Sequence, residues 1–136
     1  MKTINFERGQ DPKKAMNIGK RALIKNWFDV LGVSPEEYTI DDNLNIKVRR
    51  SLDLRYTQIT SLPDNLSVEG NLYLANTPII SLPDNLKVEG WLDLRNSQIT
   101  SLPDNLSVGK SLDLINTKIT SLPDNLSVGG EIYKDF

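Results

Sequence analysis

Residue types that favour recognition stand beside regularly spaced leucines in the middle of this sequence. Tyrosine, tryptophan and arginine are enriched in binding hot spots, and Tyr73, Trp91 and Arg95 lie close to successive Leu-x-Leu pairs. In an extended Leu-x-Leu segment both leucines point to one face and the residues around them point to the other. The outward residues of paired strands form columns with a spacing of about 4.8 Å. We therefore predict a partner-binding surface made of Asp53, Arg55, Tyr73, Trp91, Asp93, Arg95, Asp113 and Ile115.

An alternative interpretation gives the same columns no partner. Trp91 replaces a small polar residue, and one exposed indole can lie across a neighbouring side chain. Asp53 beside Arg55, and Asp93 beside Arg95, are then solvated charge pairs that contribute about 0 to 1 kcal/mol each. Substitution of Tyr73 and Trp91 distinguishes the two interpretations, because only the first predicts a loss of binding.

Catalytic and metal-binding chemistry finds little support in the composition. The chain has no histidine and no cysteine, which removes the commonest general base, thiolate chemistry and the usual zinc ligands. Asp41-x-Asn43-x-Asn45 begins like a calcium loop, but Ile46 replaces the glycine that the loop requires. One aspartate recurs in every repeat between proline and asparagine, which is typical of a turn. These recurring aspartates are Asp64, Asp84, Asp104 and Asp124. We expect no catalytic residue, no metal, no cofactor and no enzyme activity.

These side chains must be positioned by a repeating architecture. The hexapeptide Ser-Leu-Pro-Asp-Asn-Leu begins at residues 61, 81, 101 and 121, and a fixed period of 20 residues is typical of stacked coils. Each Leu-x-Leu predicts one short strand of a parallel sheet, and the recurring proline predicts an extended, polyproline-like return leg. Glycines before each Leu-x-Leu indicate a tight corner or a positive φ. The sequence predicts a solenoid of about five short parallel strands.

The repeat resembles a known family. Its pattern, Leu-x-Leu-x-x-(Thr/Ser)-x-Ile-x-x-Leu-Pro, is similar to the 20-residue "LPX" leucine-rich repeats of bacterial and phage proteins, and it covers residues 51–134. This resemblance implies a leucine-rich-repeat protein whose concave strand face binds another protein. The family usually has an asparagine that forms a ladder between coils, where this chain has Thr57, Thr77, Ser97 and Thr117. Either these hydroxyls or the preceding Asn76, Asn96 and Asn116 form the internal ladder.

The residues before the repeats predict an N-terminal cap. We expect an extension over residues 1–10, a cap over 11–50 and repeats over 51–136. Asp11 as N-cap and Gly32 as C-terminal stop predict a helix from Pro12 to Leu31. Ser34-Pro35-Glu36-Glu37 matches a capping box that starts one more helical turn. One or two strands are expected to follow, with a turn at Asp41-Asp42-Asn43. The long helix is predicted to cover the first coil with one apolar stripe: Met16, Leu23, Trp27 and Leu31.

Charge and hydropathy restrict the partners and the compartment. The formal net charge of the 136 residues is −2, and no arginine-rich or aromatic stacking motif favours nucleic acid. No stretch reaches the roughly 18 apolar residues of a membrane span, and the first residues lack the apolar core of a signal peptide. We therefore expect a cytoplasmic protein with neither a membrane nor a nucleic-acid partner, and delivery by a secretion system without a cleavable signal stays open.

The function that these observations favour is recognition of a protein partner through the strand face. The alternative is a structural component of a phage or mobile-element particle, which binds through the cap or through the open end of the last coil. That open end also suggests an end-to-end homodimer. Contacts confined to the strand face favour recognition, whereas contacts spread over the cap and residues 132–136 favour assembly.

Overall fold

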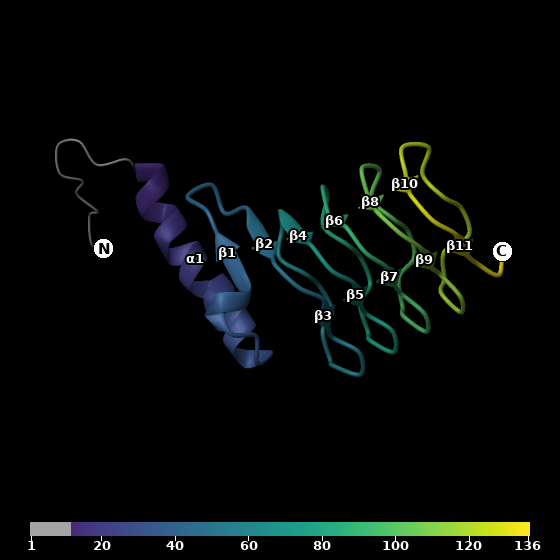
Figure 1. Cartoon of the computed structure of the whole chain (residues 1–136), viewed down its shortest axis with the longest axis horizontal. Coiled ribbons are helices and arrows are strands. Elements are labelled where there is room, and N and C mark those ends of the chain that lie inside the picture. The colour runs from purple at the N-terminus through teal and green to yellow at the C-terminus, as the bar shows by residue number, and fades with distance from the viewer. Residues whose placement is uncertain (1–11) are drawn as a thin grey trace, which may run out of the picture.

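A computed structural model describes residues 12–136 of the chain, with side chains described from residue 17 onward. The described part is a β-solenoid of about four turns with 20-residue spacing, preceded by one helix, α1 (Pro12–Val30). The coils stack side by side along the long axis, and α1 and the last coil lie at opposite ends (Figure 1). The predicted extension and the Asp11 cap lie outside the described residues.

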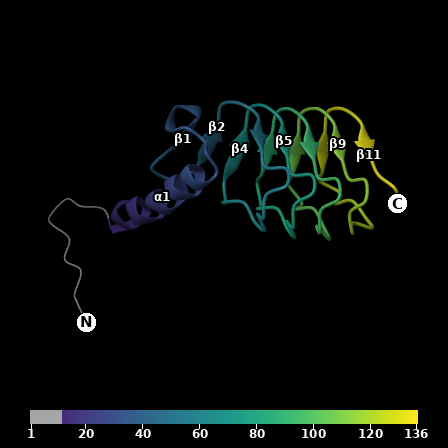
Figure 2. The ribbon, with the colours of Figure 1, turned by 90° about the horizontal axis from the view of Figure 1, so that it is seen from below.

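Each coil contributes two short strands, one to each of two sheets (Figure 2). We call the five-stranded one the Leu-x-Leu sheet; its neighbouring strands are all parallel. In chain order its members are β3 (Leu52–Asp53), β5 (Leu72–Tyr73), β7 (Leu92–Asp93), β9 (Leu112–Asp113) and β11 (Ile132–Tyr133). This sheet confirms the predicted set of five short parallel strands.

The other sheet, which we call the Leu-x-Val sheet, has six strands. Its first two strands are antiparallel, and the remaining neighbours are parallel. In chain order they are β1 (Tyr38–Ile40), β2 (Ile46–Val48), β4 (Leu66–Val68), β6 (Lys87–Val88), β8 (Ser107–Val108) and β10 (Ser127–Val128). Only one strand per coil was predicted, and the second arises because Leu66 and Val68, like their equivalents in other coils, both point inward.

The interior of the solenoid is a continuous stack of aliphatic side chains. Leu72, Leu74, Leu92 and Leu94 are fully buried, and the leucines and valines of the Leu-x-Val sheet meet them from the other wall. Burying each such side chain contributes about 1.5–3 kcal/mol. Every coil covers the next, so the outward face of the Leu-x-Leu sheet rests on a packed layer that fixes its backbone.

Glycine occupies the corner between the two strands of each coil. Of the two reasons expected for it, a tight corner or a positive φ, only the first applies. The corner glycines do not adopt positive φ, which Gly32 alone among the described glycines does. Instead, a Cβ on Gly90 would lie 2.8 Å from the carbonyl oxygen of Gly70 in the preceding coil. The corner requires glycine because adjacent coils approach each other closely there.

The cap helix ends one residue before the predicted Leu31, and its core-facing stripe differs only in part from the predicted one. Gly32, with φ 76°, follows the helix and stops it. Leu23 is 72% exposed, so its assignment to the buried stripe was wrong, whereas Phe28 is fully buried and stacks on Tyr38 with ring centroids 4.0 Å apart. Of the predicted stripe, Trp27 and Leu31 do pack against the core, and Ile24 and Phe28 complete the buried side of the helix. The side chain of Met16 lies outside the described residues.

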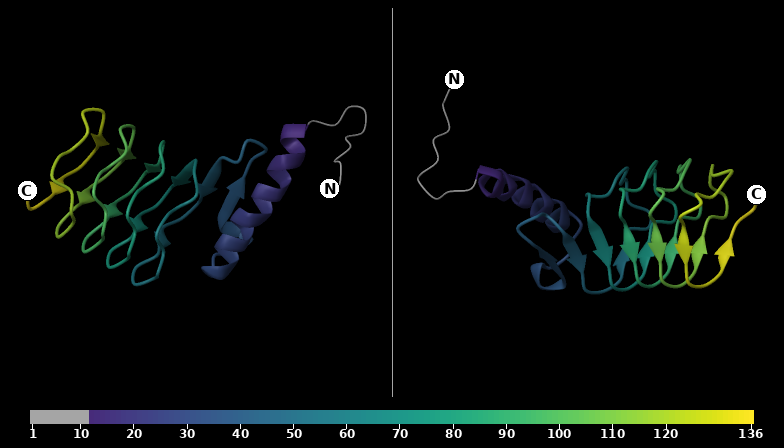
Figure 3. Two further views of the ribbon diagram at one scale, coloured as in Figure 1. Left: turned by 180° about the vertical axis from the view of Figure 1, so that it is seen from behind. Right: turned by 90° about the horizontal axis from the view of Figure 1, so that it is seen from above.

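A hairpin joins the cap to the first coil (Figure 3). The short helix η1 (Pro35–Glu37) forms where the capping box predicted a turn, but the Ser34 side chain makes no capping hydrogen bond. Strands β1 and β2 then pair antiparallel around the predicted turn. The carboxylate of Asp41 holds that turn, because it accepts hydrogen bonds from the backbone N–H groups of Asn43 and Asn45 at 2.9 Å each. Strand β2 also pairs with β4, so cap and repeats share one sheet.

Candidate functional site

The outward face of the Leu-x-Leu sheet brings the predicted recognition residues together in columns. The central column runs across the five strands in register, so that each residue faces its equivalent in the next coil. Tyrosine occupies its second and fifth positions. In order it contains Asp53, Tyr73, Asp93, Asp113 and Tyr133.

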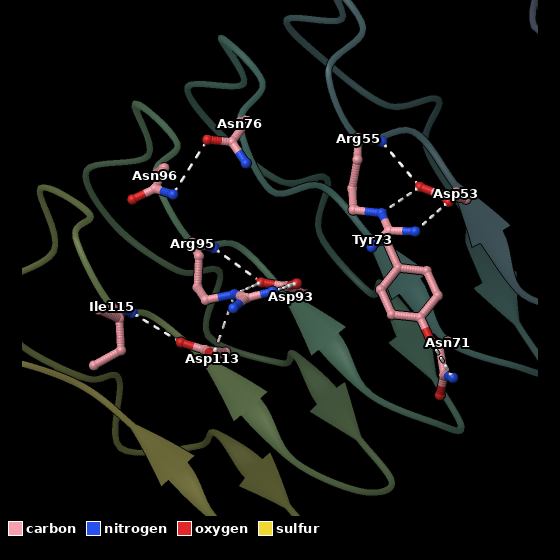
Figure 4. Close-up of polar contacts among 10 residues, drawn as sticks. All are labelled: Asp53, Arg55, Asn71, Tyr73, Asn76, Asp93, Arg95, Asn96, Asp113 and Ile115. Carbon is pink, nitrogen blue, oxygen red and sulfur yellow. Dashed lines mark hydrogen bonds and ion pairs between the residues drawn. The ribbon is translucent and has the colours of Figure 1, made fainter.

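Asp53 and Arg55 form a two-pronged ion pair at the first coil (Figure 4). The Arg55 Nε and Nη2 donate to the two carboxylate oxygens at 2.9 and 2.7 Å. The Arg55 guanidinium carbon also lies 4.9 Å from the ring centroid of Tyr73 in the next coil. Hydrogen bonds from Arg55 lower the pKa of Asp53, and those same bonds raise the pKa of Arg55. The pair thus holds the guanidinium within cation–π distance of the Tyr73 ring.

Asp93 and Arg95 repeat the arrangement two coils later, in a more buried setting. The Arg95 Nε and Nη2 donate to Asp93 at 2.9 and 2.8 Å, and only 8% of the Asp93 side chain is exposed. These hydrogen bonds are the main cause of the raised pKa of Arg95. Arg95 also reaches the next coil, where its Nε lies 3.5 Å from Asp113 Oδ2. Asp93 and Asp113 together hold the Arg95 guanidinium in place.

Asn71 contacts Tyr73 and Trp91, and it was not among the residues predicted from the sequence. Its Nδ2 donates to the Tyr73 hydroxyl at 2.7 Å, and its Oδ1 accepts the backbone N–H of Trp91 at 2.8 Å. Ser51 and Ser111 accept a backbone N–H from the following coil in the same way. The signal in the sequence is a hydrogen-bonding residue immediately before the Leu-x-Leu pair.

Tyr133 belongs to the site as well, although the predicted set omits it. Its ring lies parallel to that of Trp91, with an interplanar angle of 16° and centroids 6.4 Å apart. The two rings lie on either side of the coil that carries Ser111, which is buried. Both remain substantially exposed, at 41% for Trp91 and 43% for Tyr133. Its place in the Tyr73 column is the signal that could have identified Tyr133.

The structure resolves which residues form the ladder between coils. The Nδ2 of Asn96 donates to the Oδ1 of Asn76 at 3.1 Å (Figure 4). The Nδ2 of Asn116 donates to the Oδ1 of Asn96 at 2.7 Å. This ladder is exposed, so it is not the internal ladder that was expected. The hydroxyl residues point inward instead, and Thr77 Oγ1 donates to the Leu74 carbonyl of its own coil.

Tyr56 occupies the equivalent of these asparagines in the first coil. Its φ is +64° and its side chain is 76% exposed. The asparagines adopt the same left-handed conformation, which their short amide side chains tolerate better than a tyrosine does. An exposed aromatic residue in a strained backbone position adds contact surface at the edge of the site.

The described part of the chain carries neither a candidate metal site nor a candidate membrane-spanning helix. Within residues 12–136 no group of three or more acidic, histidine or cysteine side chains is placed to hold a metal ion. The same residues contain no helix with the length and hydropathy of a membrane span. The arrangement of ordered arginines, carboxylates and exposed rings suits non-covalent contact.

Comparison with known proteins adds no assignment. No family model matches the chain, and neither a curated protein nor a solved structure matches it.

Proposed function

We propose that this protein is a non-enzymatic recognition scaffold of the leucine-rich-repeat type, without a cofactor. It binds a protein partner through the outward face of the Leu-x-Leu sheet. The observation that carries this proposal is the pair of parallel, exposed rings of Trp91 and Tyr133 on the same face as the ordered Arg95. Exposed aromatic residues and arginine are the side chains that dominate binding energy when a partner covers them.

Preorganisation of the face supports the proposal. Association loses about 0.5–1.5 kcal/mol for each flexible side chain that it immobilises. Here Asp53 already holds Arg55, Asp93 already holds Arg95, and Asn71 already holds the Tyr73 hydroxyl. A partner that docks on these groups therefore loses less side-chain entropy than it would on a mobile surface.

The experiment is a quantitative capture of partners from lysate of the source cells. The native chain is compared with a variant that combines Tyr73→Ala and Trp91→Ala, two side chains on the proposed face. We expect the variant to melt within a few degrees of the native chain and to lose the captured partner. Retention of the partner at native levels by the folded variant would contradict binding through this face.

A second candidate function, assembly into a larger particle through the cap, rests on the exposed side of α1. Ile18, Leu23 and Val30 are 64%, 72% and 78% exposed. A groove of about 240 Å³ lies between the helix and the first return leg, lined by Leu23, Trp27 and Pro63 among others. Combining Leu23→Ser with Val30→Ser provides the matched variant for the capture experiment. Loss of the partner with this variant, and not with the face variant, would favour assembly.

A further inference from the structure

In two of the three Leu-Asp-Leu segments the next residue is an arginine, and its side chain reaches the central residue of the next coil. Arg55 binds its own Asp53 and lies over the ring of Tyr73. Arg95 binds its own Asp93 and contacts Asp113. In both coils one side chain links a carboxylate to its neighbour in the central column (Figure 4).

The fourth coil repeats the first pair without the arginine. Asp113 and Tyr133 are partners in register, as Asp53 and Tyr73 are. Ile115 occupies the position that corresponds to Arg55, and it is 37% exposed. An aspartate and a tyrosine therefore stand in the arrangement that holds a guanidinium elsewhere in the same molecule, and an isoleucine takes its place.

The Asp113 carboxylate accepts the same backbone hydrogen bond as the Asp53 carboxylate does. Its Oδ1 accepts the backbone N–H of Ile115 at 3.1 Å, and Asp53 Oδ1 accepts the backbone N–H of Arg55 at the same distance. The side-chain hydrogen bonds that Asp53 receives from its arginine have no equivalent at Asp113 among the described residues. Its ion pair with Arg95 is long, at 3.5 Å, because Asp93 holds that guanidinium at shorter distances.

Around this position the Arg95 guanidinium, 3.5 Å from Asp113 Oδ2, opposes a second cation, whereas two aromatic rings and a further carboxylate attract one. Trp91 brings a second ring parallel to that of Tyr133, and a cation near an indole face is stabilised more than near any other aromatic side chain. Glu131 stands where Asn71 stands relative to the first tyrosine, and its carboxylate adds negative charge.

We propose that Asp113, Tyr133 and Trp91 form a subsite for an arginine side chain of the protein partner. The partner's guanidinium pairs with the Asp113 carboxylate and lies against the Tyr133 ring, as Arg55 does with Asp53 and Tyr73. This inference rests on the proposed function and specifies the chemistry that the face recognises. A planar guanidinium fits the site better than an ammonium, because it makes two parallel hydrogen bonds and stacks on a ring.

The first test supplies the arginine within the chain. Ile115→Arg is expected to reproduce the Arg55 arrangement, with two hydrogen bonds to Asp113 and the guanidinium over Tyr133 in a crystal structure of the variant. Ile115→Gln is the matched control, since it adds a polar side chain without charge. A variant structure in which the introduced guanidinium points into solvent, away from Asp113, would contradict the proposed geometry.

The second test uses short peptides and NMR spectroscopy of the full chain. A peptide with a central arginine is compared with peptides that carry lysine or citrulline there, and citrulline keeps the shape but removes the charge. The arginine peptide is expected to shift the Trp91 indole and Ile115 amide signals in a saturable way. Asp113→Asn is expected to weaken this binding about tenfold, because it removes a charge-assisted hydrogen-bonded pair. Ile115→Arg is expected to abolish the binding, whereas Ile115→Gln is expected to retain it.

Two outcomes would overturn the subsite. One is equal binding of the arginine and citrulline peptides, or of the arginine and lysine peptides. The other is arginine-dependent shifts that Ile115→Arg leaves unchanged. The proposed function has its own readout, because a whole partner that is lost with the Tyr73 and Trp91 variant, but retained by Ile115→Arg, keeps the face and excludes this subsite.

Discussion

Four hydroxyl residues follow the outward strand positions of successive coils, and one of them behaves differently. The Oγ1 atoms of Thr57, Thr77 and Thr117 donate to the carbonyl three residues earlier at 2.7–2.9 Å. Ser97 is buried to the same degree as Thr77, but its hydroxyl has no hydrogen-bond partner. A buried polar group without a partner destabilises the folded state. The third coil therefore contains a local defect that its neighbours lack.

Ser97→Thr should stabilise the protein. The threonine hydroxyl is expected to donate to the Leu94 carbonyl as in the other coils, and the free energy of unfolding should rise by about 1 kcal/mol. Urea denaturation of the native chain, of this variant and of Ser97→Ala measures the effect. If the hydroxyl makes no bond, Ser97→Ala should be neutral or stabilising, so strong destabilisation by alanine would contradict this account of Ser97.

The Asp41 turn predicts a pH dependence. Hydrogen bonds from the Asn45 side chain and backbone lower the pKa of Asp41. Because the pKa of Asp41 is lowered in the native state, the unfolded chain binds more protons than the native chain as the pH falls toward and below the ordinary pKa of 3.8. The stabilisation is complete above that value and is lost as the pH falls through the native pKa.

Asp41→Asn should therefore flatten the acid limb of the stability curve. Urea unfolding between about pH 5 and pH 2 is expected to show a shallower decline for the variant than for the native chain. Asp53 also has a lowered pKa, so a part of the decline should remain. Identical slopes for the two proteins would exclude the Asp41 turn as a source of the dependence.

At the scale of elements, the corners between strands determine how closely coils stack. Gly90→Ala places a methyl group against the Gly70 carbonyl and should lower the free energy of unfolding by about 1–3 kcal/mol. Gly19→Ala is the matched control, because a Cβ there meets no atom within 4 Å. In the helix it should stabilise by about 0.5–1 kcal/mol. Equal melting temperatures for both variants would contradict the close approach at the corner.

Sequence periodicity was sufficient to predict most of the elements. The spacing of 20 and the Leu-x-Leu alternation identified the five-stranded sheet, and Gly32 identified the helix end. The second sheet was not expected, because its strands follow the Pro-Asp-Asn of each coil, where an extended, polyproline-like return leg was predicted instead of a strand. The buried stripe of α1 was misplaced at Leu23, because a helix with apolar residues around its circumference gives several candidate stripes and tertiary packing selects one.

The site was predictable in its outline, since register alone aligns the central column. Contacts that depend on side-chain direction were not predictable. The stacking of Trp91 on Tyr133 spans two coils, and nothing in the spacing shows which way an indole leans. Whether the asparagines or the hydroxyl residues point inward could be decided only from the backbone conformation. The left-handed φ of Asn76 turns its amide outward and the side chain of Thr77 inward.

For the molecule as a whole, stability depends on neighbouring coils that bury one another. Leu94 is fully buried in the central coil, and Leu94→Ala should lower the free energy of unfolding by about 2–5 kcal/mol. With so few coils the loss is expected to unfold the solenoid as one unit. Thermal unfolding followed by circular dichroism measures this, and a variant that melts as late and as cooperatively as the native chain would contradict the stacked core.

The central claim is that the outward face of the Leu-x-Leu sheet is the recognition surface, and side-chain footprinting on the complex tests it most directly. Hydroxyl-radical oxidation of the exposed side chains is measured by mass spectrometry with and without the captured partner. We predict that oxidation of Tyr73, Trp91 and Tyr133 falls in the complex, whereas oxidation of Leu23 and Val30 on α1 is unchanged. Protection confined to α1, with full oxidation of the three aromatic residues, would contradict the claim.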